Sequence, residues 1–341
     1  MTATLASGTI IFIVGNSRSG TTMMRRVLGK HPEIYMLEEL HFFEQLWSSS
    51  DKDKQLTVPE AAALASRLFF IQRDGYLTEM NEQKHFEEAM NMVSSMEKAL
   101  YPHEVLRTFL HYETARGGRS IPCEKTPQDV FYIKEILELF PEAKIINMVR
   151  DPRGVMLSQK RKWQRRNMGA GFMTRKEQRR LRINYHPITI SKLWNASQRA
   201  AQPFLEHERV RTVIFENLVN QSEELVRGLC SFLEITYDPA MLHIPQVGSS
   251  NEADKPDTFG IKTERAGNWE KGGLNKGEIW FCQQICSNYM AAYGYDVKPI
   301  QPGIGYKLWY YVSFPFKLAL ALLFNLHRMK NIGEAIRRRL K

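Results

Sequence analysis

The fold of this 341-residue chain follows from residues 9–22, TIIFIVGNSRSGTT. The first six residues form a short, continuous apolar run rich in β-branched side chains, typical of a buried parallel strand. A loop bounded by Gly15 and Gly20 follows, and residues 23–28 continue with the pattern of a helix. This succession of strand, loop and helix directs backbone N–H groups and the positive end of the helix dipole at an anion. The sequence therefore predicts a phosphate-binding loop.

The loop differs from a Walker A loop in its cation. The spacing between Gly15 and Gly20 is that of a Walker A motif, but Thr21 stands where the lysine belongs, and the cation is Arg18 inside the loop. A Walker lysine contacts the β- and γ-phosphates beside Mg²⁺. An arginine fork suits bidentate contact with a diester-like or mixed-anhydride anion. The alternative is a plain glycine turn carrying an exposed arginine.

Two further apolar runs have the same character. Residues 144–149 form a run that ends before Arg150, and residues 210–215 form a run that ends at Phe215. Long helical stretches separate the runs, at 60–72, 85–116, 128–139, 185–206, 218–233 and 276–292, and residues 248–260 look like a loop. This order indicates an α/β fold with three layers and a mostly parallel central sheet flanked by helices. Because ligands of such sheets bind beyond the carboxyl ends of the strands, we expect Gly15, Arg150 and Phe215 to lie together.

Charge is concentrated in two stretches. The composition, 43% apolar and 25% charged, is that of a globular protein, with a net charge of +10. Residues 150–182 contain twelve Lys/Arg against two acidic residues, and residues 327–341 contain six against one. Anionic partners are therefore expected, among them an acidic acceptor or an anionic lipid. No nucleic-acid motif accompanies the charge, which argues against nucleic-acid binding.

Cysteine usage and the N-terminus indicate a cytoplasmic, reducing location. Only four cysteines occur, at 123, 230, 282 and 286, and their spacing favours buried reduced thiols over disulfides or a zinc site. The apolar run at 9–14 is short, has no basic residue before it and leads directly into a glycine loop, so it does not read as a signal peptide.

Together, the first loop and a second motif, Val149-Arg150-Asp151-Pro152-Arg153, resemble the sulfotransferases that use 3′-phosphoadenylyl sulfate (PAPS), a family with a P-loop-like fold. The resemblance implies that the loop holds the 5′-phosphosulfate through Ser17, Arg18, Ser19, Gly20, Thr21 and Thr22. It implies that Arg150 and Ser158 hold the 3′-phosphate. Phe215, at the place of a family tyrosine, would lie near the adenosine. Lys262, in the string Lys262-Thr263-Glu264-Arg265-Ala266-Gly267-Asn268-Trp269, would close on the 3′-phosphate.

The same resemblance supplies candidate catalytic residues. The Glu38-Glu39-Leu40-His41 string resembles both the tyrosylprotein and the heparan-sulfate branches, and both alignments select Glu39 as the base. Lys125 resembles the family lysine that steadies the transferring group, with Arg18 stabilising the leaving charge and Glu124 as a candidate salt-bridge partner of Lys125. The histidine of the small-molecule branch is absent, which leaves His41 as a second acid/base candidate or a packed core residue. Arginine and lysine take the charge-balancing role, so no metal is expected.

The C-terminal part differs from the rest. We expect a catalytic domain over residues 1–300 and an apolar, basic helical extension over 301–341. Residues 308–324 approach the length of a membrane span, but Pro315 and Lys317 fall within them. The positive-inside rule would place the catalytic domain outside the cytoplasm, away from PAPS. Two alternatives stay open: peripheral contact of 308–341 with the cytoplasmic face of a membrane, or packing against the chain's own core or a partner subunit in a homo-oligomer.

The predicted function is transfer of a sulfuryl group from PAPS to an acceptor hydroxyl or amine on a glycan, lipid or peptide. One rival is a P-loop kinase or NTPase with a degenerate Walker A loop, for which Asp151 is the candidate magnesium ligand. A second is a membrane-associated binding protein that has lost turnover. The acceptor is left open, because resemblance of a catalytic half does not transfer acceptor specificity.

Overall fold

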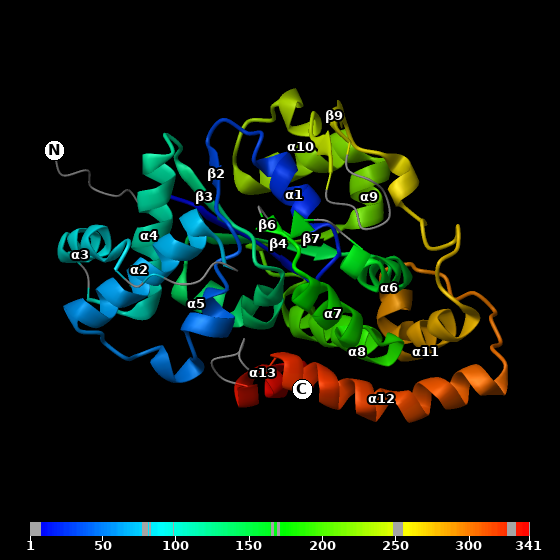
Figure 1. Cartoon of the computed structure of the whole chain (residues 1–341). Coiled ribbons are helices and arrows are strands. Elements are labelled where there is room, and N and C mark those ends of the chain that lie inside the picture. Colours follow the sequence, from blue (N-terminus) through cyan, green and yellow to red (C-terminus); the bar gives the residue numbers. More distant parts are fainter. Residues whose placement is uncertain are drawn as a thin grey trace.

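A five-stranded parallel sheet in the order β2-β3-β1-β4-β7 forms the centre of the molecule (Figure 1). The computed structural model describes residues 8–76, 81, 83–97, 99–164, 167–168, 171–247, 255–325 and 332–340. The strands are β1 (Ile10–Gly15), β2 (Ile34–Met36), β3 (Ile121–Glu124), β4 (Ala143–Val149) and β7 (Val210–Ile214). Every pairing in this sheet is parallel. The carboxyl ends of all five strands therefore open at one edge.

Helices cover both faces of the sheet, as the three-layer prediction requires. Ile10, Phe12 and Val14 of β1 face one apolar cluster, and Ile11 and Ile13 face the other. The first cluster is completed by α2 (Val58–Asp74), α3 (Phe86–Ser94), α4 (Pro102–Arg116) and α5 (Ile133–Leu139), and the second by α1 (Thr21–Leu28), α9 (Phe215–Asn220) and α10 (Ser222–Leu233). Burial on both faces explains why β1 is apolar at every position instead of alternating.

A third apolar cluster lies beyond the end of β4. It joins α6 (Pro152–Lys160), α8 (Pro187–Ala201) and α11 (Lys276–Ala292). Outside these helices lie α7 (Arg175–Asn184), α12 (Ile304–Asn325) and α13 (Ile332–Leu340), and the orange α12 runs along the edge of the molecule below α7, α8 and α11 (Figure 1). The minor elements are β5 (Asn167–Met168), β6 (Gly171–Phe172), β8 (Pro245–Gln246), β9 (Lys255–Phe259), η1 (Phe42–Leu46), η2 (Ser49–Asp51), η3 (Pro127–Tyr132), η4 (Lys162–Gln164), η5 (Gln202–Phe204), η6 (Pro239–Leu242) and η7 (Thr263–Arg265).

The three predicted strands and the α/β class are confirmed, and several details need correction. The stretch predicted over 218–233 is two helices, α9 and α10, which meet at Gln221. Strands β2 and β3 escaped prediction because they are short and β3 contains Pro122. The helical stretch predicted over 85–116 is two helices, because Pro102 starts α4. Within the predicted loop 248–260, residues 248–254 lie outside the described residues, whereas Lys255–Phe259 forms β9 and pairs with β8. All four cysteines are buried and free, as predicted.

Candidate active site

All five strands of the sheet deliver a predicted site residue to the same edge. The residues are Glu39, three positions after β2, Lys125 after β3, the 15–22 loop after β1, Arg150 after β4 and Phe215 after β7. Of these strands, β1 lies at the centre, between β3 and β4. The loop thus has the Lys125 strand on one side and the Arg150 strand on the other.

The loop after β1 has the backbone of an anion-binding turn. Arg18 and Gly20 both have positive φ angles, 77° and 98°, and Gly20 is the N-cap of α1. A Cβ atom on Gly20 would overlap the ring of Phe215, so this position requires glycine for space as well as for conformation. Ser19 is fully buried, and its Oγ has no hydrogen-bond partner within the described part of the chain. The first N–H groups of a helix also lack intrahelical acceptors. The loop therefore offers donors to an anion.

The two predicted phosphate motifs form one cluster. Arg18 donates from Nε to Oγ of Ser158 at 2.9 Å. Arg150 donates from Nη1 to the carbonyl oxygen of Arg18 at 3.4 Å. The residues predicted for the 5′ and the 3′ ends of one ligand thus lie in direct contact.

Arg150 is a buried cation that donates hydrogen bonds to two backbone carbonyls. Its second hydrogen bond, from Nη2, goes to the carbonyl of Arg265 at 3.3 Å. Its guanidinium lies 4.2 Å from the centroid of the Phe215 ring, so Phe215 contributes a cation–π contact. Burial lowers the pKa of Arg150, and the charge of Glu216 acts against that effect. Its Nε is buried without a hydrogen-bond partner among the described residues. A positive charge in this setting is suited to an anionic ligand.

The late loop brings Arg265, which the sequence reasoning missed, to Arg150. Besides the carbonyl contact, the charge of Arg265 contributes to lowering the pKa of Arg150, after the larger effect of burial. Lys262 is the residue immediately before η7, and its assignment to the 3′-phosphate stays a prediction. The signal for Arg265 was present in the same string, three positions later.

Asp151 and Arg153 have structural roles. The assignment of Arg153 to the cofactor motif is therefore corrected. Arg153 is buried, pairs with Asp151 at 2.7 Å and lies 4.0 Å from the centroid of the Trp269 ring. Asp151 caps α6 by accepting from the N–H of Arg153 at 2.8 Å. The candidate magnesium ligand of the kinase reading is therefore engaged in a helix cap and an ion pair.

Glu39 and Lys125, predicted as base and charge stabiliser, form an ion pair. The other carboxylate oxygen of Glu39, Oε2, lies 3.7 Å from Nε2 of His41, and the Glu39 side chain is 41% exposed. Burial acts to raise the pKa of Glu39, but the charges of Lys125 and His41 outweigh it, and the pKa is lowered. Glu38 instead pairs with Arg25 at 2.6 Å. The geometry thus separates the two adjacent carboxylates, and Glu39 is the one at Lys125.

Glu124 is turned inward, which corrects its reading as a partner of Lys125. Its Oε1 accepts from the N–H of Leu40 at 3.3 Å and from the hydroxyl of Thr126. The hydroxyl of Thr126 accepts in turn from the N–H of His41 at 3.4 Å. Burial raises the pKa of Glu124 to about 7. Glu124 and Thr126 therefore fix the backbone that follows Glu39.

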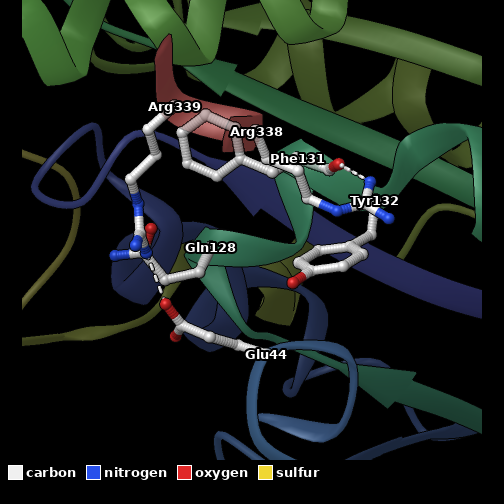
Figure 2. A pocket seen from close by; sticks show the side chains of 6 residues that line it. All are labelled: Glu44, Gln128, Phe131, Tyr132, Arg338 and Arg339. Atoms are coloured by element: carbon white, nitrogen blue, oxygen red, sulfur yellow. Dashed lines mark hydrogen bonds and ion pairs between the residues drawn. The ribbon is translucent and has the colours of Figure 1, made fainter. Parts of the chain in front are cut away.

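The C-terminal helix α13 adjoins this side of the site (Figure 2). Arg339 pairs with Glu44, whose Oε2 lies 3.9 Å from Nδ1 of His41. Arg338 donates to the carbonyl of Phe131 at 3.0 Å. Of the two alternatives left open for residues 308–341, these contacts of Arg338 and Arg339 fit packing against the chain's own core.

Comparison with known proteins identifies the family of this chain. Residues 11–239 match the profile described as "Sulfotransferase family". The chain is 24% identical over 238 residues to a putative protein-tyrosine sulfotransferase of Caenorhabditis briggsae, covering 69% of this chain and 68% of the relative. It is 26% identical to the protein-tyrosine sulfotransferases of Drosophila melanogaster and, as type 1, Danio rerio, each over 69% of this chain. The match covers only 40% and 55% of those two relatives.

A solved structure shares the fold. The sulfotransferase domain of the Synechococcus PCC 7002 olefin synthase superposes with a TM-score of 0.50 at 20% identity, covering 85% of this chain and 96% of that domain. The profile match spans more than half of the chain and contains the loop, Glu39, Lys125 and Arg150. The chain therefore belongs to the sulfotransferase family.

Proposed function

We propose that this protein transfers a sulfuryl group from PAPS to an acceptor hydroxyl or amine and releases adenosine 3′,5′-bisphosphate. Family membership supports sulfuryl transfer in general. The observation that carries the choice of donor is the buried guanidinium of Arg150, joined to the phosphate loop through the carbonyl of Arg18. A donor with phosphates at both the 5′ and the 3′ positions calls for two anion sites in one cluster.

The side chains present fit such a donor. Two buried donors, Ser19 Oγ and Arg150 Nε, have no hydrogen-bond partner among the described residues, and phosphate oxygens are strong acceptors. Residues 17–22 would hold the 5′ end. Arg150, Ser158 and Arg265 would hold the 3′-phosphate, with Lys262 as a further candidate.

The chemistry gives Glu39, Lys125 and Arg18 complementary roles. When bound, PAPS supplies a sulfuryl group on a phosphate leaving group. Glu39 accepts the proton of the acceptor, and its lowered pKa keeps it ionised for that step. Lys125 and Arg18 balance the negative charge that develops on the transferring and leaving oxygens. Lys125 also holds Glu39 in place through the ion pair.

Calorimetry with adenosine 3′,5′-bisphosphate, compared with ATP plus Mg²⁺, tests the donor. We expect the bisphosphate to bind without metal and Arg150→Ala to weaken its binding by about 30- to 100-fold, because charge-assisted hydrogen bonds are lost. Arg227→Ala is the control, since Arg227 pairs with Glu223 on the surface of α10. A preference for Mg-ATP, or unchanged binding in Arg150→Ala, would contradict the proposal.

For the acceptor, we propose a tyrosine-containing peptide as the first substrate to test. Three relatives carry the name protein-tyrosine sulfotransferase, which supports a phenolic hydroxyl. The assay offers a tyrosine peptide, a glycan and a hydroxylated lipid with labelled PAPS. Label on the peptide alone supports the choice, and label on the glycan or the lipid alone overturns it while leaving the donor assignment intact.

A further inference from the structure

Helix α12 exposes an apolar face along its whole length. It is the one helix in the described part of the chain that is long and apolar enough to cross a membrane. Its exposed side chains are apolar or aromatic, among them Leu308, Trp309, Tyr311, Val312, Phe316 and Leu323. Phe316 and Leu323 are 68% and 64% exposed. A patch of this extent marks an interaction surface.

The opposite face of α12 is bound to the protein from end to end. Near its start, Asn275 donates to the hydroxyl of Tyr310 at 2.8 Å. In the middle, the ring of His186 lies 3.2 Å from the hydroxyl of Ser313. At its end, Arg180 donates to the side chain of Asn325 at 2.7 Å. A helix held lengthwise against the body is placed to lie on a bilayer, whereas a spanning helix would leave the body.

The surroundings of this face are basic. No Asp or Glu occurs between Asp296 and Glu334, whereas five Lys/Arg do. Helix α7, which contacts α12 through Arg180, carries five Lys/Arg against Glu177 alone, and Glu177 pairs with Arg180. The fold thus brings α7, from the first basic stretch of the sequence, beside the apolar helix. Arg165 and Arg166 of that stretch lie outside the described residues.

We propose that the exposed face of α12 docks on an anionic lipid bilayer, with the helix parallel to the membrane surface and its aromatic and aliphatic side chains among the lipids. Basic residues around an apolar face match the charge of anionic head groups. Trp309 and Tyr311 are amphipathic and suit the interface. A second copy of the chain is disfavoured, because two-fold pairing through α12 would bring two basic borders together.

Vesicle flotation of the full chain tests whether α12 docks on the bilayer. We expect binding to vesicles of 70% phosphatidylcholine and 30% phosphatidylglycerol, weaker binding to pure phosphatidylcholine, and release in alkaline carbonate. The double substitution Phe316→Asp with Leu323→Asp should reduce binding at least ten-fold. Both side chains are exposed, so circular dichroism should show an unchanged melting temperature. Val58→Asp, an exposed apolar residue on α2, is the matched control and should bind like the wild type.

Three results would overturn the proposal. One is wild-type binding by the double variant. Another is retention in carbonate, which indicates a spanning helix. The third is a dimer in light scattering without lipid that the same two substitutions dissociate. The readouts do not depend on the reaction, so they stand whether or not PAPS is the donor.

Discussion

The side chains of Arg18 and Ser158 are joined by a 2.9 Å hydrogen bond although 140 residues separate them along the chain. The bond ties the loop after β1 to α6. Ser158→Ala removes this acceptor from the Arg18 guanidinium. We expect about ten-fold weaker binding of adenosine 3′,5′-bisphosphate, the size of one hydrogen bond to a charged group. Ser191→Ala, at a buried serine of α8 whose hydroxyl donates to the carbonyl of Pro187 in the same helix, should leave binding unchanged in the same titration.

A pair of glycine substitutions separates conformational strain from overlap. Gly118 and Gly20 both have positive φ angles, but a Cβ on Gly118 would meet nothing within 4 Å, whereas one on Gly20 would overlap Phe215. We expect Gly118→Ala to cost about 1–2 kcal/mol of unfolding free energy. Gly20→Ala should cost about 1–3 kcal/mol more. Urea unfolding measures both, and equal losses would refute the assigned contact.

The buried carboxyl of Glu124 makes stability depend on pH. Its folded pKa of about 7 exceeds its ordinary value of 4.5, so its contribution is full below pH 4.5 and declines as pH rises through 7. The loss is on the order of 3 kcal/mol. Glu124→Gln should remove this part of the decline. Urea midpoints from pH 4.5 to 8 test it, with Glu224→Gln on the exposed surface of α10 as control. A variant with the slope of the wild type would contradict the assignment.

The two neighbouring glutamates should differ in turnover. Glu39→Gln removes the proposed base and should lower kcat by about 10²–10⁴-fold with bisphosphate binding retained. Glu38→Gln loses only a partly exposed pair with Arg25 and should stay near the wild-type rate. Because the pKa of Glu39 is lowered, the rate should not fall until the pH is below 4.5. Equal effects of both substitutions would remove Glu39 from the base role.

Local patterns predicted the sheet where a strand is long and buried on both faces. Residues 10–15 and 143–149 meet that condition, and both strands are where the sequence placed them. The edge strand at 210–214 is shorter and partly exposed, but its β-branched run also predicted it correctly. Strands β2 and β3 have three and four residues, too few for a hydrophobic pattern, and take their conformation from pairing with neighbours. The conformation of β2 and β3 is therefore set by pairing with strands far away in the sequence, which a local sequence pattern does not reveal.

The site divides in the same way. Local sequence signals predicted the loop, Arg150 and Glu39. These signals are the glycines of the loop, the strand end before Arg150 and the family string around Glu39. The roles of Glu124 and Arg265 depend on which direction a side chain or carbonyl takes in the fold, and the sequence around them leaves that open. For Arg153 the sequence motif was misleading. It suggested contact with the cofactor, but the side chain forms an ion pair with Asp151.

The meeting of five strand ends at one edge has a consequence for how ligand binding changes the stability of the fold. Because the residues proposed to bind the ligand are spread from Ser17 to Arg265, no single segment of the chain can form the site alone. A bound bisphosphate would then stabilise the folded state as a unit. Amide hydrogen exchange should slow in every strand of the sheet, including β2 and β7 at its two sides, and not merely in the loops that touch the ligand.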